Sequence, residues 1–106
     1  MSKPVARRKV TVSNPQGLHA RPADLFARLA NRFQSTIEVI KDGQRVDGKS
    51  ILEVLTLAAA RGTRLMIVAR GNDAQEAVDA LGHLVELENP VEALADESEN
   101  NQTGSA

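Results

Sequence analysis

Pro22 restricts where the first helix of this chain can begin. A proline is tolerated only in the first turn of a helix, where its missing N–H has no intrahelical partner to lose. Beyond it, apolar side chains recur at the spacing of one helical face, at Leu25, Phe26, Leu29, Ala30 and Phe33. The sequence therefore predicts a helix from about Ala20 to Phe33, with His19 at its N-cap.

The predicted helix start is suited to binding an anion. Its unpaired backbone N–H groups and positive dipole end stabilise negative charge, and phosphate is the expected ligand. Arg21 adds a planar, permanently charged fork for phosphoryl oxygens. The same positive field disfavours the imidazolium form, which keeps His19 neutral and nucleophilic near neutral pH. These residues favour a phosphoryl-accepting histidine, while an exposed or N-capping His19 beside a solvated arginine fits them as well.

The rest of the chain alternates between strand and helix patterns. Alternating polarity, β-branched runs and the Asp42-Gly43 hairpin signal predict four strands, over residues 9–13, 36–40, 44–47 and 63–70. Capping-box patterns at residues 50–53 and 73–76 predict a short helix ending near Ala60 and a last helix after Asp73. His83 falls on the solvated side of that last helix, whose apolar stripe consists of Ala74, Ala77, Val78, Leu81, Leu84 and Val85.

The order of these elements, β-α-β-β-α-β-α, predicts an α+β fold. Three helices are expected to cover one face of a four-stranded, mostly antiparallel sheet, with Leu65, Ile67 and Ala69 on one face of the fourth strand. Residues 1–88 form this domain. Residues 89–106 are acidic and polar and contain no aromatic side chain, so we expect them to be a disordered tail.

Composition excludes several classes of protein. A chain of 106 residues builds one domain with a modest core. Its lack of cysteine excludes a disulfide framework and a thiolate metal site, and no metal or organic cofactor is implied. No apolar run reaches the roughly 18 residues of a membrane span, and the basic residues 1–8 are not followed by the apolar core of a signal peptide. We therefore expect a cytoplasmic protein without membrane insertion.

Charge is distributed unevenly along the chain. Residues 1–50 hold ten Lys and Arg against four Asp and Glu, whereas residues 51–106 hold three against ten. If folding keeps these regions apart, the positive field would steer acidic partners toward His19. If folding mixes them, no steering follows.

Residues 43–50 match the P-loop pattern G-x-x-x-x-G-K-S letter for letter, which alone would suggest nucleotide binding at Gly43–Ser50. Three observations count against it. The chain is too short for the βαβ units of a parallel sheet. The strand at 63–70 ends without a magnesium-binding aspartate, and Asp42-Gly43 is better explained as a hairpin.

An RNA-binding domain is a second alternative, because such modules share a compact α+β plan and a basic face. They stack bases on aromatic side chains, however, and this chain has only Phe26 and Phe33, both assigned to the core. We therefore expect no nucleic-acid partner.

The segment Gly17-Leu18-His19-Ala20-Arg21-Pro22-Ala23 resembles the phosphohistidine signature of the HPr family, the histidine-containing phosphocarriers of the bacterial phosphoenolpyruvate-dependent sugar phosphotransferase system. The similarity extends to Gly48-Lys49-Ser50-Ile51-Leu52, which resembles the family's regulatory-serine segment, and covers roughly Lys9 to Glu88. It implies an open-faced β-sandwich. It further implies that enzyme I phosphorylates Nδ1 of His19, that Arg21 stabilises the phosphate, and that a IIA component of a sugar permease takes the phosphoryl group onward. Such a protein is a stoichiometric carrier more than a stand-alone enzyme.

The resemblance also implies regulation and docking. Ser50 would be the target of an HPr kinase/phosphorylase, although as a helix N-cap it needs no such function. Glu53 stands where many family members have glycine, and its carboxylate would compete with a phosphate for the same donors. Enzyme I and the IIA components would dock on an apolar patch beside His19, formed by Leu18, Ala20, Ile51, Leu52 and Leu55. A regulatory paralogue of the nitrogen-related or carbon-control branch would share the histidine chemistry, and in either case we expect a monomer.

Overall fold

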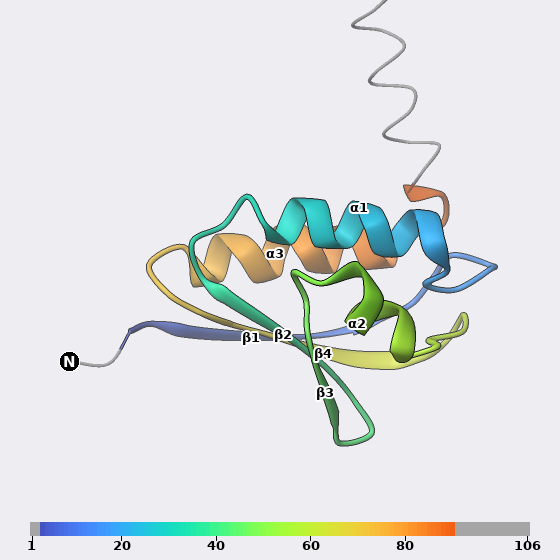
Figure 1. Cartoon of the computed structure of the whole chain (residues 1–106), viewed down its shortest axis with the longest axis horizontal. Coiled ribbons are helices and arrows are strands. Elements are labelled where there is room, and N and C mark those ends of the chain that lie inside the picture. Colours follow the sequence, from blue (N-terminus) through green and yellow to red (C-terminus); the bar gives the residue numbers. More distant parts are fainter. Residues whose placement is uncertain (1–2, 91–106) are drawn as a thin grey trace, which may run out of the picture.

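The computed structural model describes residues 3–90, which form a four-stranded sheet and three helices (Figure 1). The strands are β1 (Val5–Thr11), β2 (Thr36–Lys41), β3 (Gln44–Asp47) and β4 (Arg64–Arg70). The helices are α1 (Ala20–Ala30), α2 (Ile51–Thr56) and α3 (Ala74–Glu86). Most of the expected tail, residues 91–106, lies outside the described residues.

The sheet has the strand order β1-β4-β2-β3, and each neighbouring pair is antiparallel. In the centre of the sheet Val39 of β2 lies opposite Ile67 of β4 and Val46 of β3, and all three side chains are buried. Because strand side chains alternate between faces, this register directs one apolar set toward the helices. The predicted α+β fold and its element order are confirmed.

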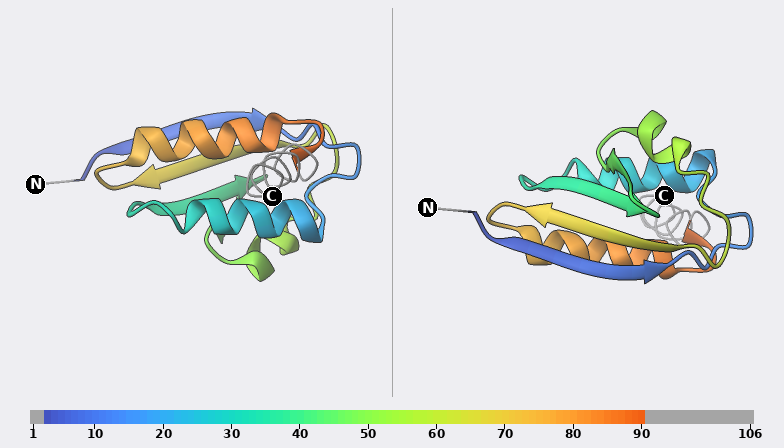
Figure 2. Two further views of the ribbon diagram at one scale, coloured as in Figure 1. Left: turned by 90° about the horizontal axis from the view of Figure 1, so that it is seen from above. Right: turned by 90° about the horizontal axis from the view of Figure 1, so that it is seen from below.

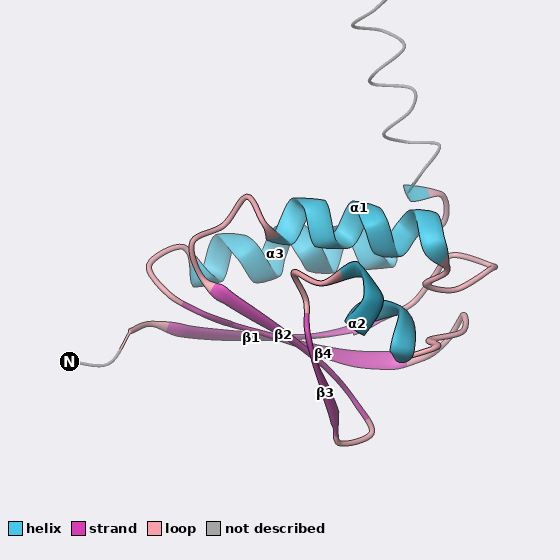
Figure 3. Cartoon of the chain, in the orientation of Figure 1, coloured by secondary structure: helices cyan, strands magenta, loops and turns pink. Residues whose placement is uncertain are grey.

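The helices lie on one face of the sheet, as Figures 2 and 3 show. α1 and α3 run side by side over the strands, and α2 packs against α1 and the edge strand β3. All six residues of the predicted α3 stripe are buried, as are Leu65, Ile67 and Ala69 of β4, whereas His83 is exposed. The core therefore lies between the sheet and the helices, and no described helix covers the other face of the sheet.

Several predicted boundaries differ from those observed. α1 ends at Ala30 instead of Phe33, because beyond it the N–H groups of Arg32 and Phe33 bond to carbonyls three residues back, at Leu29 (3.0 Å) and Ala30 (3.2 Å), instead of four. α2 ends at Thr56 instead of Ala60, because Ala58 has a φ of +48°, which breaks the helical path. Strand β1 begins at Val5, four residues earlier than predicted, because Val5 to Arg8 also pair with β4 and the ladder runs along the whole of that strand.

The capping box predicted at Asp73 is wrong in its side-chain contacts. Asp73 is the N-cap residue of α3, but its carboxylate makes no capping hydrogen bond. It accepts instead from the backbone N–H of Gln34 (2.8 Å) and from the N–H (3.0 Å) and hydroxyl (2.5 Å) of Ser35. The carboxylate therefore joins the loop before α3 to the loop before β2, a contact between residues almost forty positions apart.

These bonds make stability depend on the charge of Asp73. The Ser35 hydroxyl, followed by the N–H of Gln34, lowers the pKa of the carboxyl below its ordinary value of 3.8. A lowered folded-state pKa stabilises the protein above the unfolded-state value, and that contribution is lost as the pH falls through the folded-state value. We expect the difference in melting temperature between the protein and Asp73→Asn to be constant near neutral pH and to shrink below about pH 4. Thermal melts followed by circular dichroism from pH 7 to 2 measure this, and a difference that grows on acidification contradicts it.

Candidate functional site

His19 occupies the N-cap of α1, as the position of Pro22 predicts. Its backbone is extended (φ −82°, ψ −168°), and its carbonyl accepts the N–H of Ala23 at 2.9 Å. The imidazole makes no capping hydrogen bond, and the side chain is half-buried. The ring therefore lies at the positive end of the helix, and within residues 3–90 neither of its nitrogens has a hydrogen-bond partner.

The loop before His19 is fixed against a distant part of the chain. Leu18 donates its N–H to the carbonyl of Ala59 (2.8 Å), and Gly17 donates to Asn14 (2.9 Å). Gly17 has a φ of +74°, and a Cβ there would overlap the carbonyl oxygen of Ala59. Only glycine permits both this backbone conformation and this close approach. The loop after α2 thus sets the position of the histidine.

His19 and Arg21 line one hollow of about 320 Å³ with residues from both ends of the domain, namely Asn14, Pro15, Gln16, Asn89 and Pro90. Arg21 is exposed, and its guanidinium makes no ion pair with another residue in the described range 3–90. The structure therefore brings together the two residues that sequence analysis singled out. It also adds Asn89 and Pro90, which no local pattern could have indicated, because only the packing of α3 places them here.

Ser50 caps α2 in a different way from the predicted capping box. Its hydroxyl accepts the N–H of Glu53 (3.2 Å), as expected. The Glu53 carboxylate does not return to the N–H of Ser50, which is bound to the carbonyl of Asp47 (3.1 Å); it accepts from the N–H of Asp47 (3.0 Å) instead. The Glu53 carboxylate therefore binds the last residue of β3, and the Glu53 N–H binds the hydroxyl of Ser50.

The expected docking patch is smaller than the sequence suggested. Leu52 is 77% exposed and Ile51 37% exposed, and Leu55 is half-buried. Ala20 is exposed at the start of α1. Leu18 is only 7% exposed and belongs to the hydrophobic core, so its inclusion in the patch is wrong. The hydrogen bond from the Leu18 N–H to the carbonyl of Ala59 holds this residue against the loop after α2. That contact joins distant parts of the chain, so the sequence could not reveal it.

The P-loop alternative does not fit the structure. Asp42 and Gly43 both have positive φ (48° and 84°) and form the tight turn between β2 and β3. Residues 44–47 are a strand, and the N–H of Gly48 is bound to the carbonyl of Ile37 at 2.8 Å. The segment is therefore one arm of a hairpin in an antiparallel sheet, without the open ring of N–H groups that cradles a phosphate.

Cationic side chains do not gather around His19, because Arg21 is the only Lys or Arg that lines its hollow. Within residues 3–90, no group of three or more His, Asp or Glu side chains is placed to hold a metal ion. In the same range, the helices are too short or too polar to span a bilayer. The site consequently offers one imidazole, one guanidinium and the N–H groups of a helix start.

An open-faced α+β sandwich with a free histidine at the start of its first helix and an arginine two residues later defines a histidine-type phosphocarrier domain. A family model described as "PTS HPr component phosphorylation site" matches residues 6–87. The chain thus belongs to the HPr family, the phosphocarriers of the bacterial phosphotransferase system.

Individual relatives agree with this family. The HPr-like protein Crh of Bacillus subtilis is 43% identical over 84 residues, which are 79% of this chain and 99% of the relative. Phosphocarrier protein HPr of Neisseria meningitidis is 39% identical over 79 residues, 74% of this chain and 89% of the relative. A crystal structure of HPr from Bacillus anthracis superposes with a TM-score of 0.74 at 43% identity, covering 76% of this chain and 96% of that one. A solved structure of the Bacillus subtilis Crh is described as a swapped dimer, so the family does not by itself establish the expected monomer.

Proposed function

We propose that this protein carries a phosphoryl group on His19 between enzyme I and the IIA components of sugar permeases. The observation that carries the proposal is the imidazole at the N-cap of α1, which makes no capping bond to its own helix. As the bond from phosphorus to the donor on enzyme I breaks, a bond forms to Nδ1 of His19. The reverse displacement then transfers the group to the IIA component.

The residues around the imidazole support this transfer. The developing phosphoryl oxygens would accept from the free N–H groups of the first turn of α1, and Arg21 would neutralise their charge. Phosphoryl transfer needs positioning and charge stabilisation more than covalent assistance from the protein. The Leu18–Ala59 bond and the conformation of Gly17 hold the ring in place before the partner arrives. The hollow is open, so the ring is accessible to the donor.

Chemical stability of the adduct tests this proposal. Incubation with enzyme I and labelled phosphoenolpyruvate should produce a stoichiometric adduct that is labile in acid and stable in alkali, as expected for a phosphorus–nitrogen bond. Adding a IIA component should then remove the label. An acid-stable adduct would indicate a hydroxyl acceptor and would overturn the proposal.

We further assign docking of these partners to Ala20, Ile51, Leu52 and Leu55, because Ile51 and Leu52 expose apolar side chains on the helix that packs against α1. The carrier domain comprises residues 1–88, with residues 89–106 as an appended tail. We propose that the domain acts as a monomer, in which His19 and Arg21 of the same chain line one hollow.

A regulatory member of the family is the second candidate, favoured by the similarity to proteins named Crh. In either case we propose that Ser50 is phosphorylated by an HPr kinase/phosphorylase that uses ATP. Ser50 is half-buried at the start of α2, where the backbone N–H groups would stabilise a phosphate. Its double negative charge would then oppose acidic partners at the adjoining patch.

Glu53 should oppose that phosphorylation. Its carboxylate already accepts the Asp47 N–H beside Ser50, so an incoming phosphate meets a like charge. We expect Glu53→Gln, which keeps an acceptor but removes the charge, to increase labelling of Ser50 by the kinase several-fold. Glu76→Gln is the matched control, because Glu76 also lies in the first turn of a helix, α3, but away from Ser50. Ser50→Ala should remain unlabelled, and equal labelling of all variants contradicts the site.

A further inference from the structure

The face of the sheet turned away from the helices carries a row of cations on β1 and β4. We name this row the cationic stripe; it consists of Arg7, Lys9, Arg64 and Arg70, all of which are exposed. None of the four forms an ion pair with another residue in the described part of the chain. Arg8 differs, because it alternates to the helix side and pairs with Glu86 of α3 at 2.9 Å. The outer face therefore holds positive charge that the described domain leaves uncompensated.

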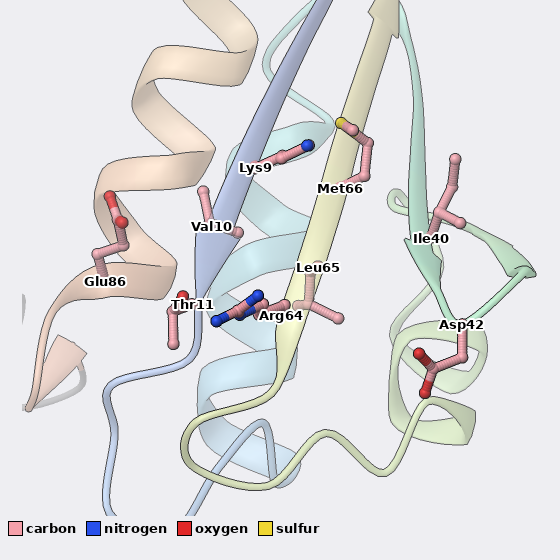
Figure 4. A pocket seen from close by; sticks show the side chains of 9 residues that line it. All are labelled: Lys9, Val10, Thr11, Ile40, Asp42, Arg64, Leu65, Met66 and Glu86. Atoms are coloured by element: carbon pink, nitrogen blue, oxygen red, sulfur yellow. The ribbon is translucent and has the colours of Figure 1, made fainter.

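Strand register places the four cations in one continuous row. Val5 lies opposite Arg70 and Thr11 opposite Arg64, while Arg7 and Lys9 lie between these ends, opposite Val68 and Met66. At about 3.3 Å per residue, the row extends for about 20 Å along the β1–β4 ladder. A hollow of about 610 Å³ includes Lys9, Arg64 and the half-buried Met66, and Figure 4 shows these side chains on the two strands.

Carboxylates near the stripe have other roles or lie at its margin. On the same face Glu38 of β2 pairs with Arg45 of β3 at 3.5 Å, and Asp47 of β3 accepts the N–H of Lys49. Glu86 lines the edge of the hollow but pairs with Arg8, and Asp42 lies in the hairpin turn at the opposite edge. The β1–β4 half of the face thus has four cations and no carboxylate.

The sequence contains an anionic segment of matching size. Residues 91–106 hold four carboxylates and no Lys or Arg, so residues 1–90 hold thirteen cationic side chains against ten carboxylates. The chain as a whole has a net charge of −1, which divides into +3 for residues 1–90 and −4 for the remainder. We name residues 92–99 the acidic segment, because it contains all four carboxylates, Glu92, Asp96, Glu97 and Glu99.

The length of chain beyond Pro90 allows the acidic segment to reach the end of the stripe at Lys9 and Arg64. Glu99 follows Pro90 by nine residues, which span up to about 30 Å when extended. Glu86, the last residue of α3, lines the edge of the hollow, while its carboxylate pairs with Arg8 on the helix side of β1. The eight residues 92–99 extend to about 26 Å, which is enough to pass from the end of the domain at Pro90 to the nearer cations of the stripe, Lys9 and Arg64. This segment also lies beyond residue 87, where the match to the family model ends.

We propose that the acidic segment docks on the cationic stripe of the same chain. Because the segment is tethered, its effective concentration at the stripe is in the millimolar range, so weak charge pairing suffices. Docking covers a surface that would otherwise attract nucleic acid and other polyanions. The interaction weakens with ionic strength, since exposed charges are screened. It does not depend on phosphoryl transfer at His19.

Paramagnetic NMR on the full chain tests the docking. The sequence contains no cysteine, so Asn100→Cys introduces a single site for a nitroxide label next to the acidic segment. At low ionic strength the label should broaden the amides of residues 7–9 and 64–70, independently of protein concentration. The broadening should be lost in 0.5 M NaCl (about a 4 Å screening length) and in the variant Arg7→Gln/Lys9→Gln.

The matched control is Arg28→Gln/Arg32→Gln, which removes the same charge from exposed residues of the helix layer and should leave the broadening unchanged. A second experiment removes the negative charge of the acidic segment in the labelled protein. The substitutions Glu92→Gln, Asp96→Asn, Glu97→Gln and Glu99→Gln should also abolish the broadening. Four results overturn the proposal: no broadening of β1 and β4, broadening confined to residues near His19, broadening that rises with protein concentration and so indicates a second copy, or equal loss in the control.

Discussion

Replacing His19 with alanine should abolish phosphorylation by enzyme I. The chain contains only two histidines, and His19 alone lies at a helix N-terminus beside an arginine. Alanine removes the nitrogen that forms the bond to phosphorus, so no label from phosphoenolpyruvate should remain on the protein. Because the imidazole makes no capping bond, the free energy of unfolding should change by no more than about 0.5 kcal/mol.

The second histidine supplies the matched control for this experiment. His83 is exposed on α3, so His83→Ala should retain the labelling of the original protein. Labelling followed on gels, with urea unfolding of each variant, separates loss of chemistry from loss of fold. Persistent acid-labile label on His19→Ala would sink the assignment, as would labelling that disappears only in His83→Ala.

Replacing Gly17 with alanine should be the most destabilising of the substitutions considered. A left-handed backbone costs a non-glycine residue about 1–2 kcal/mol, and the new Cβ must also displace the backbone carbonyl of Ala59. Adding the typical cost of overpacking, about 1–3 kcal/mol, gives roughly 2–5 kcal/mol in the free energy of unfolding. The same shift should slow transfer from enzyme I, because a displacement of about 1 Å at a reacting group costs on the order of 100-fold in rate.

Gly43 separates the two contributions at Gly17. It has a similar φ of +84°, but a Cβ there would meet nothing within 4 Å. Gly43→Ala should therefore lose only the backbone part, about 1–2 kcal/mol, and should transfer phosphoryl groups at the original rate. Urea unfolding and the enzyme I assay measure both quantities. Equal effects of the two substitutions would show that the contact with Ala59 has no role.

Local signals in the chain predicted the elements well where the elements depend on neighbours in sequence. The position of Pro22 located the start of α1 correctly, and Asp42-Gly43 located the β2–β3 turn. Capping patterns were less reliable, since they identify a side chain that can accept a bond without identifying its donor. Asp73 accordingly binds Gln34 and Ser35 in a distant loop instead of its own helix.

The candidate site was predictable only where the position of a residue depends on its neighbours in sequence. His19 and Arg21 are placed by the helix that contains them, so the motif and the helix start were sufficient to find them. Leu18 was misplaced because its burial depends on a backbone bond to Ala59, forty-one residues away. Asn89 and Pro90 were missed because α3 brings them to His19 only when it packs beside α1.

The sequence by itself determined the order of helices and strands, the inward face of each, and an imidazole and a guanidinium at one helix start. These follow from proline geometry, turn residues and hydrophobic periodicity, which act within a few residues. Only the tertiary structure decided the hollow around His19, the burial of Leu18 and the alignment of four cations on one sheet face. Those features arise from strand register and from packing between segments far apart in the chain, and neither is encoded in any single stretch.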